Sequence, residues 1–195
     1  VVGAVKPTDT VLVSAAAGSV GSAVGQIAKD MGCKAYGIAG GAEKCRIVSE
    51  EFGFDGCVDY KSNDWPERLH AMCPDGFDVY FDNVGGEMLD NVMAQMKRDG
   101  RIPVCGVLSE YNAAGEPYGI RNGRLLFDKS LRLQGFVLNS YRDKWDEARA
   151  ELVSLISAGK LKYLETIANG IDLAPAAFIG MLEGKNLGKQ LVRLS

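Results

Sequence analysis

Residues 11–29 read VLVSAAAGSVGSAVGQIAK: a short strand-like run, a turn of small residues and an apolar-striped helix. The turn spaces its small residues as Ala16-x-Gly18-x-x-Gly21. Gly18 lets the backbone approach a bound phosphate pair, and Gly21 lets the helix lie close to the sheet. The N–H groups and the dipole at the start of the helix attract negative charge. Although Ala16 replaces the first glycine of the usual motif, the stretch predicts a dinucleotide-binding turn, with a ligand-free turn as the alternative.

The rest of the chain alternates strand-like and helix-like segments. The predicted strands are 10–16, 34–40, 56–60, 77–84, 101–107 and 131–139, and the predicted helices are 19–31, 42–52, 65–72, 86–97, 142–158 and 174–182. Such alternation is typical of a parallel sheet covered on both faces. We therefore predict an α/β protein with a doubly wound, six-stranded parallel Rossmann sheet over residues 1–160. Residues 161–195, which end in a strand over QLVRL, would be a remnant of a second domain.

Three of the predicted helices carry apolar stripes. They comprise Val20, Val24, Ile27 and Met31; then Met88, Leu89, Val92, Met93 and Met96; and then Trp145, Ala148, Leu152, Leu155 and Ile156. Spacings of three and four residues place each set on one side of its helix. We predict that these sides are buried, with the methionines filling gaps in the core.

Composition narrows the class of partner. The 195 residues hold 22 basic and 25 acidic side chains spread along the chain, for a formal charge of −3. No basic stripe indicates a nucleic acid or a membrane surface, so we expect a small-molecule partner. No apolar stretch approaches the ~20 residues that span a bilayer, and no signal segment is evident. We expect a soluble, cytoplasmic protein.

The cysteines and the single histidine do not suggest a metal site or a catalytic triad. The five cysteines, Cys33, Cys45, Cys57, Cys73 and Cys105, are more than ten residues apart in sequence, which is too far for a metal-ligand cluster or a disulfide framework. We expect them to be free thiols in a reducing compartment. His70 falls in a predicted surface helix, where a role in nucleophilic catalysis is not expected.

The end of the second predicted strand indicates which nicotinamide cofactor is bound. An NAD site places Asp or Glu there, about 20 residues past the glycine turn, to bind the ribose 2′-hydroxyl. This chain has Ala39-Gly40-Gly41-Ala42 instead. A 2′-phosphate can therefore enter, and Lys44 is placed to pair with it. The pattern favours NADPH over NADH, although Glu43 is an unfavourable neighbour and Lys44 could be an ordinary exposed helix lysine.

Several ordered blocks resemble one family. They are VSAAAGSVGSAVGQIAK (13–29), GAEK (41–44), DYK (59–61), FDNVGGE (81–87), GRIPVCGVLSEYN (100–112), LQGFVLN (133–139) and AAFIGMLEGKNLGK (176–189). Together they resemble the zinc-free, NADPH-dependent branch of the medium-chain dehydrogenase/reductase superfamily. Within it, they are similar to the group of prostaglandin reductase, leukotriene B4 12-hydroxydehydrogenase, curcumin reductase and alkenal double-bond reductases. Members of that group begin with a GroES-like substrate domain, which this sequence does not contain.

The resemblance implies roles for particular residues. It assigns cofactor contacts to Gly18, Ser19, Val20 and Gly21 at the pyrophosphate, Lys44 and Tyr60 at the adenosine end, Asn83 at the ribose, Cys105, Gly106, Val107, Phe136, Val137 and Leu138 around the nicotinamide, and Asn186 near the C-terminus. It assigns the catalytic role to Tyr111, which would orient or polarise a substrate carbonyl. The alternative for Tyr111 is a packed loop anchor, and Phe136 can belong to the core at the same time.

The resemblance also implies a reaction, which is reduction of the C=C bond of an α,β-unsaturated aldehyde or ketone by hydride transfer from NADPH to the β-carbon. No metal is required. Two alternatives stay open: a fragment of a zinc-type alcohol dehydrogenase, and a cofactor-binding module without turnover. Members of the group commonly pair through the sixth strand, so we expect a possible homodimer through residues 131–139.

Overall fold

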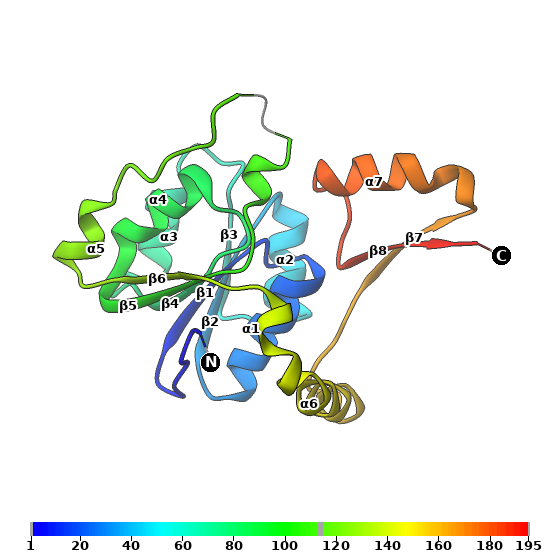
Figure 1. Cartoon of the computed structure of the whole chain (residues 1–195), viewed down its shortest axis with the longest axis horizontal. Helices are drawn as coiled ribbons and strands as arrows, with labels where there is room; N and C mark the ends of the chain where they lie inside the picture. The colour runs from blue at the N-terminus through cyan, green and yellow to red at the C-terminus, as the bar shows by residue number, and fades with distance from the viewer. Residues whose placement is uncertain (1, 113–114, 195) are drawn as a thin grey trace.

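The computed structural model describes residues 2–112 and 115–194, and its centre is a six-stranded parallel sheet (Figure 1). The strands are β1 (Thr10–Ser14), β2 (Lys34–Ala39), β3 (Gly56–Asp59), β4 (Phe77–Phe81), β5 (Met96–Val104) and β6 (Arg132–Gly135). Their order is β3-β2-β1-β4-β5-β6. The predicted doubly wound Rossmann sheet is thereby confirmed, and strand order reverses between β1 and β4.

Helices cover both faces of the sheet. They are α1 (Ser19–Asp30) and α2 (Ala42–Glu50) on one face, and α3 (Trp65–Met72), α4 (Gly86–Gln95) and α5 (Arg124–Asp128) on the other. All five residues of β1 are buried, and its side chains alternate between two apolar clusters, with Val11 and Val13 in one and Leu12 in the other. This alternation is what a strand covered on both faces requires.

Several predicted boundaries are wrong, and the strand predicted over 101–107 runs instead from Met96 to Val104. The helix predicted over 86–97 ends at Gln95, because Met96 has extended backbone and pairs with Phe77 as the first residue of β5. The strand predicted over 131–139 shortens to β6, because the chain coils into a 3-10 helix, η2 (Leu138–Lys144), beyond Val137. β6 therefore offers a shorter edge for pairing than the sequence pattern indicated.

The apolar stripe predicted for α1 is not its buried side. Val20 is 48% exposed, whereas the residues that α1 buries are small or polar: Gly21, Ser22, Gly25, Gln26 and Ala28. The reason is close packing, since a Cβ added at Gly25 would lie 1.7 Å from the ring of Phe54. The larger stripe residues instead face an apolar groove of about 480 Å³ between α1, η2 and the first residues of the chain. Of the stripe predicted for α4, Leu89, Val92 and Met93 are buried and Met88 is half-buried, while Met96 is buried as the first residue of β5.

The buried side predicted for the helix over 142–158 is also wrong. This helix, α6 (Trp145–Ser157), has no buried residue in the structure. Its contacts are mainly with η2, and it is seen end-on below α1 in Figure 1. Leu152 and Ile156 are exposed, while Trp145 and Leu155 are half-buried, because the helix lies beside the sheet rather than upon it.

The last part of the chain forms a separate small unit to one side of the sheet (Figure 1). It consists of β7 (Glu165–Asn169), η3 (Ile171–Leu173), α7 (Ala174–Leu182) and β8 (Lys189–Arg193). β7 pairs in parallel with β8. The closing strand is one residue earlier than predicted, and β7 was not predicted as a strand. We call residues 165–193 the C-terminal unit, and β1 to β6 with α1 to α5 the sheet body.

Within the described part of the chain, no helix combines the length and hydropathy that crossing a bilayer demands.

Candidate functional site

The predicted site residues converge on the carboxyl ends of the parallel strands. At the reversal point between β1 and β4, Ser14 and Asn83 tie the two strand ends together. The Asn83 side-chain amide donates to Ser14 O at 2.7 Å, and the Asn83 backbone N–H donates to Ser14 Oγ at 2.9 Å. Open α/β sheets bind ligands in the crevice at this point.

The glycine turn after β1 has the geometry that the sequence predicts. Gly18 is the N-cap of α1, where no side chain caps the helix and no acidic residue occupies the first turn. A Cβ at Gly21 would lie 2.3 Å from Ala15 O, so only glycine allows this approach of helix to strand. The start of α1, with Ser19 and Val20, is left open to an anion.

The structure explains why Ala16 can replace the first glycine of the motif. Ala16 is fully buried, and it faces Gly37 in β2, where a Cβ would lie 2.8 Å from that of Ala16. The space that the first glycine of the motif usually provides is provided here by Gly37 in the neighbouring strand. Ala15 takes the positive φ of the turn, at 50°.

Asp82 organises the turn after β4, and sequence reasoning missed it. Its buried carboxylate accepts hydrogen bonds from Tyr80 Oη at 2.8 Å and from the backbone N–H groups of Val84 and Gly85 at 2.9 and 3.0 Å. Burial, and then the Asp82 charge, raise the pKa of Tyr80 well above its usual value, so this phenol stays a donor. In the sequence, the signal for this role was an acidic residue that directly precedes Asn83 and comes shortly before Gly85 and Gly86.

The segment after β5 docks on this turn. The N–H groups of Cys105 and Gly106 donate to Asp82 O at 2.7 and 3.3 Å, and Leu108 N donates to Asn83 O at 3.1 Å. Val107 lies against Gly85, where a Cβ would come within 3.3 Å of its side chain. Asn83, Cys105, Gly106 and Val107 are thus neighbours. Burial, and then the Asp82 charge, raise the pKa of the Cys105 thiol.

Lys44, Tyr60 and Asn186 form a second corner beside α2. Lys44 Nζ donates to Gly184 O at 2.7 Å and to Asn186 O at 2.6 Å. Burial, and then the nearby charge of Lys61, lower the pKa of Lys44. Tyr60 packs on Gly40, where a Cβ would lie 2.8 Å from the ring.

The C-terminal unit reaches the site through its loops. Gly188 N donates to Ala17 O at 2.8 Å, and Gly188 forms a bridge with Gly18 of the glycine turn. Asn186 Nδ2 donates to Gly188 O at 2.9 Å. The C-terminal unit therefore closes one side of the predicted pyrophosphate turn, a contact that the sequence did not indicate.

The remaining predicted residues lie farther along the same edge of the sheet. Phe136 packs edge-on against Phe81 with 6.1 Å between ring centroids, while Val137 and Leu138 are exposed. Tyr111 ends the short helix η1 (Leu108–Glu110) and is 60% exposed. Most of the Tyr111 surface is therefore not packed against the described part of the chain.

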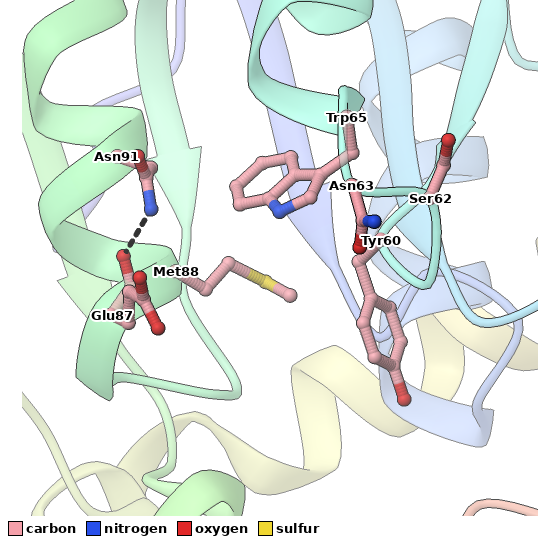
Figure 2. A pocket seen from close by; sticks show the side chains of 7 residues that line it. All are labelled: Tyr60, Ser62, Asn63, Trp65, Glu87, Met88 and Asn91. Atoms are coloured by element: carbon pink, nitrogen blue, oxygen red, sulfur yellow. Dashed lines mark hydrogen bonds between the residues drawn. The ribbon is translucent and has the colours of Figure 1, made fainter.

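A pocket of about 310 Å³ lies next to the corner of Lys44, Tyr60 and Asn186, on the far side of Tyr60 (Figure 2). Its lining residues are Tyr60, Ser62, Asn63, Trp65, Glu87, Met88 and Asn91. The Trp65 indole and the Met88 thioether reach toward each other across it from α3 and α4 (Figure 2). Sequence reasoning missed this pocket, because Met88 was assigned to the buried stripe of its helix and Trp65 was given no role.

Within residues 2–112 and 115–194, no three His, Cys, Asp or Glu side chains are grouped so that they could hold a metal ion.

Known proteins share this fold and sequence. The family model described as zinc-binding dehydrogenase matches residues 19–154. The chain is 43% identical to the NADPH-dependent curcumin reductase of Escherichia coli over 199 residues, covering 100% of this chain and 58% of that protein. It is 43% identical to the NADP(+)-dependent 2-alkenal reductase of Nicotiana tabacum, covering 97% of this chain and 55% of that protein.

Solved structures are also similar to this chain. CurA of Vibrio vulnificus in complex with NADPH has a TM-score of 0.94 and 43% identity, over 100% of this chain and 59% of that one. An NAD-dependent alcohol dehydrogenase is less similar, with a TM-score of 0.79 and 26% identity over 98% of this chain and 52% of that one. This chain thus spans under two thirds of the length of these relatives. It belongs to the medium-chain dehydrogenase/reductase superfamily, in the group that contains the curcumin, alkenal and prostaglandin reductases.

Proposed function

We propose that this chain is the NADPH-binding part of a reductase that reduces the C=C bond of α,β-unsaturated aldehydes or ketones by hydride transfer to the β-carbon. The observation that carries the proposal is the corner of Lys44, Tyr60 and Asn186. It offers a cation and an aromatic face, and Gly40, Gly41 and Ala42, which directly follow β2, carry no carboxylate where an NAD site would have an acid.

The residues present fit the cofactor. A pyrophosphate would take the open N-terminus of α1 at Gly18, Ser19, Val20 and Gly21. The 2′-phosphate would compete with two carbonyl oxygens for Lys44, and a charged acceptor makes the stronger hydrogen bond. The ribose would meet Asn83, and the nicotinamide would lie against Cys105, Gly106 and Val107 with the backbone of residues 136–138.

Tyr111 is the proposed catalytic residue. When bound, NADPH supplies the hydride, and the chain supplies orientation and charge stabilisation. The exposed Tyr111 phenol would donate a hydrogen bond to the substrate carbonyl oxygen and stabilise the negative charge that develops there. No metal takes part in this chemistry.

The C-terminal unit would belong to a second, substrate-binding domain. Its apolar side chains support this, since Phe178, Ile179 and Ile171 are all exposed. We place the domain boundary between residues 160 and 161, just after the end of α6. We also propose that the enzyme is cytoplasmic and that it forms a homodimer along the edge of β6.

Two other functions remain as outcomes of the tests. A zinc-type alcohol dehydrogenase is disfavoured by the lower similarity to the solved alcohol dehydrogenase. A module that binds NADPH without turnover is the second candidate, and an assay of turnover separates it from the reductase. Domain closure normally excludes water and completes such a pocket.

The cofactor test is a titration with NADPH and NADH, followed by the fluorescence of Trp65 and Trp145. Lys129→Ala is a matched control for Lys44→Ala, because Lys129 also donates to two carbonyl oxygens, those of Ala94 and Met96, and its pKa is also lowered by burial. Lys44→Ala should weaken NADPH binding about tenfold or more while NADH binding holds, as expected for a charge-assisted contact. Equal losses of affinity for NADPH and NADH would mean that Lys44 acts only by holding the carbonyl groups of Gly184 and Asn186 in place.

The activity test uses the full-length protein in which this chain is accompanied by its second domain. NADPH oxidation with a simple enone should fall at least about a hundredfold in Tyr111→Phe, a loss typical of removing one such donor. NADPH affinity should hold in that variant. Turnover of an alcohol in place of the enone would support the dehydrogenase alternative, and no turnover at all would support the binding module.

A further inference from the structure

Two cysteines lie in direct contact beside the predicted cofactor corner. Cys45 is in α2, Cys57 is in β3, and Cys57 Sγ donates to Cys45 Sγ across 3.0 Å. They are 12 residues apart in sequence, and the fold brings them together because α2 crosses over the β2-β3 pair. The sequence predicted five separate free thiols, and the structure instead pairs two of them.

The pair differs in exposure from Cys33 and Cys73, although Cys105 is half-buried as well. Cys33 and Cys73 each lie against a backbone carbonyl, at 3.1 and 3.4 Å, and both are buried. Cys45 and Cys57 are half-buried, so a small reagent can reach them. Sulfur atoms in this arrangement need to approach by only about another 1 Å to reach bonding distance.

We propose that Cys45 and Cys57 are a redox modification site, at which they form a reversible intramolecular disulfide. Cys45 is the attacking thiol. It lies near the N-terminus of α2, where the helix dipole favours a thiolate, and it accepts the Cys57 hydrogen bond.

The directions of the pKa shifts agree with these roles. The hydrogen bond from Cys57 lowers the pKa of Cys45, and the same bond, with burial, raises the pKa of Cys57. The cysteine with the lowered pKa is the better nucleophile near neutral pH.

The reaction balances with a small-molecule disulfide such as oxidised glutathione. The Cys45 thiolate attacks one of its sulfur atoms, which forms a mixed disulfide and releases one glutathione thiolate. The Cys57 thiol then loses its proton to solvent and attacks the Cys45 sulfur, which releases the second glutathione. Two protein thiols are oxidised, and one glutathione disulfide is reduced to two thiols.

The position of the pair couples it to the cofactor corner, and this step rests on the proposed function. Cys45 directly follows Lys44, and β3 leads from Cys57 to Asp59, whose carboxylate accepts the Gly41 N–H at the start of α2. A Cys45–Cys57 bond would draw α2 toward β3 and move Lys44 away from Asn186. We therefore expect the oxidised protein to bind NADPH about fivefold or more weakly, as for other linked sites.

The first experiment equilibrates the protein with oxidised and reduced glutathione and then counts free thiols. Oxidation should remove two of the five thiols, lower the mass by two hydrogen atoms and add no glutathione. After digestion by a protease that cleaves after glutamate, the disulfide should leave peptide 44–50 linked to peptide 52–67. Cys45→Ser and Cys57→Ser should each abolish the cross-link, while the control Cys73→Ser should keep it.

Three results would overturn the proposal: five free thiols throughout, a stable glutathione adduct on Cys45 without the cross-link, or a cross-link between different peptides. Since all three are read on the unsubstituted protein, a variant that fails to fold does not affect them. The thiol count needs no cofactor, so it remains decisive even if the chain binds no NADPH.

The second experiment titrates NADPH into the reduced and oxidised protein. By thermodynamic linkage, saturating NADPH should change the ratio of reduced to oxidised glutathione at which half of the protein is oxidised. The change should be by the same factor as the difference in NADPH affinity between the reduced and the oxidised protein. Equal NADPH affinity in both redox states would refute the coupling. Absence of NADPH binding in both states would refute the proposed function instead, with the disulfide still measured separately.

Discussion

The sheet body and the C-terminal unit contain similar apolar residues in opposite environments. Phe77 in β4 is fully buried, whereas Phe178 in α7 is 58% exposed. No residue within β7, α7 or β8 is buried, although α7 reads APAAFIGML. Regular secondary structure therefore does not by itself produce a core, because burial needs a second apolar layer at the right place.

The two regions also differ in what they contribute to the site. The sheet body provides the strand ends and the start of α1, and these depend on its buried core. The C-terminal unit provides backbone contacts at Gly184, Asn186 and Gly188. We therefore expect substitutions in the buried core of the sheet body mainly to change stability and substitutions at these contacts of the C-terminal unit mainly to change cofactor binding.

The largest difference should come from the two phenylalanines. Phe77→Ala should lower the free energy of unfolding by about 3–5 kcal/mol, since it removes a fully packed ring. Phe178→Ala should change it by about 0.5 kcal/mol or less. Urea denaturation followed by circular dichroism measures both, and equal losses would mean that α7 is packed as tightly as β4.

A smaller effect is expected where the two regions join. Gln26 is buried in α1, donates to Lys162 O at 2.9 Å and accepts from Lys162 N at 2.8 Å. Gln26→Leu should cost about 1–3 kcal/mol, because it leaves two backbone groups without partners. Proteolysis near residues 160–165 should quicken. If cleavage there were unchanged, this double hydrogen bond would not hold the C-terminal unit in place.

Gly188 tests the contribution of the C-terminal unit to binding. Gly188 has φ of 64°, and a Cβ there would lie 1.9 Å from Leu164 O. Gly188→Ala should displace the contact with Ala17, because the added Cβ would overlap Leu164 O, and it should weaken NADPH binding about tenfold, or about 1.4 kcal/mol. The melting temperature of the sheet body should stay near that of the parent protein. A large drop in melting temperature would instead show that the two regions share one cooperative core.

The smallest expected effect is a pH shift in the sheet body. The hydrogen bond from Cys57 lowers the pKa of Cys45, helped by the Ala39 backbone and Arg68 and opposed by burial and Asp59. A lowered pKa means more thiolate at a given pH, so alkylation of Cys45 should reach half its maximal rate below the pH typical of a free cysteine. Cys57→Ala should move this midpoint upward. An unchanged midpoint would remove the hydrogen bond as the cause.

Much of the fold could be predicted because strand period and helix period are local. The strands at 34–40 and 56–60 and the helices that follow them are within a few residues of those in the structure. The errors share one cause. The stripes of α1 and α6 were read as core, yet small residues decide which side of α1 meets the sheet, and the described chain buries no residue of α6.

The candidate site shows the same division. Gly18 and Gly21 were predicted because a turn between strand and helix leaves a local pattern, whereas Asn83 was assigned through the resemblance to a family. Asp82, Ser14 and the pocket beside Trp65 were missed, since their roles depend on contacts between strands that are distant in sequence.

The sequence by itself determined the alternation of strands and helices, the glycine turn and the lack of a carboxylate after β2, because each is set by residues next to one another. Only the tertiary structure decided that Ala16 faces Gly37, that Lys44 bonds the Asn186 carbonyl and that Cys45 touches Cys57. These contacts join residues 12 to 142 positions apart. They arise from how strands, helices and loops pack in the folded chain, and no local pattern encodes that packing.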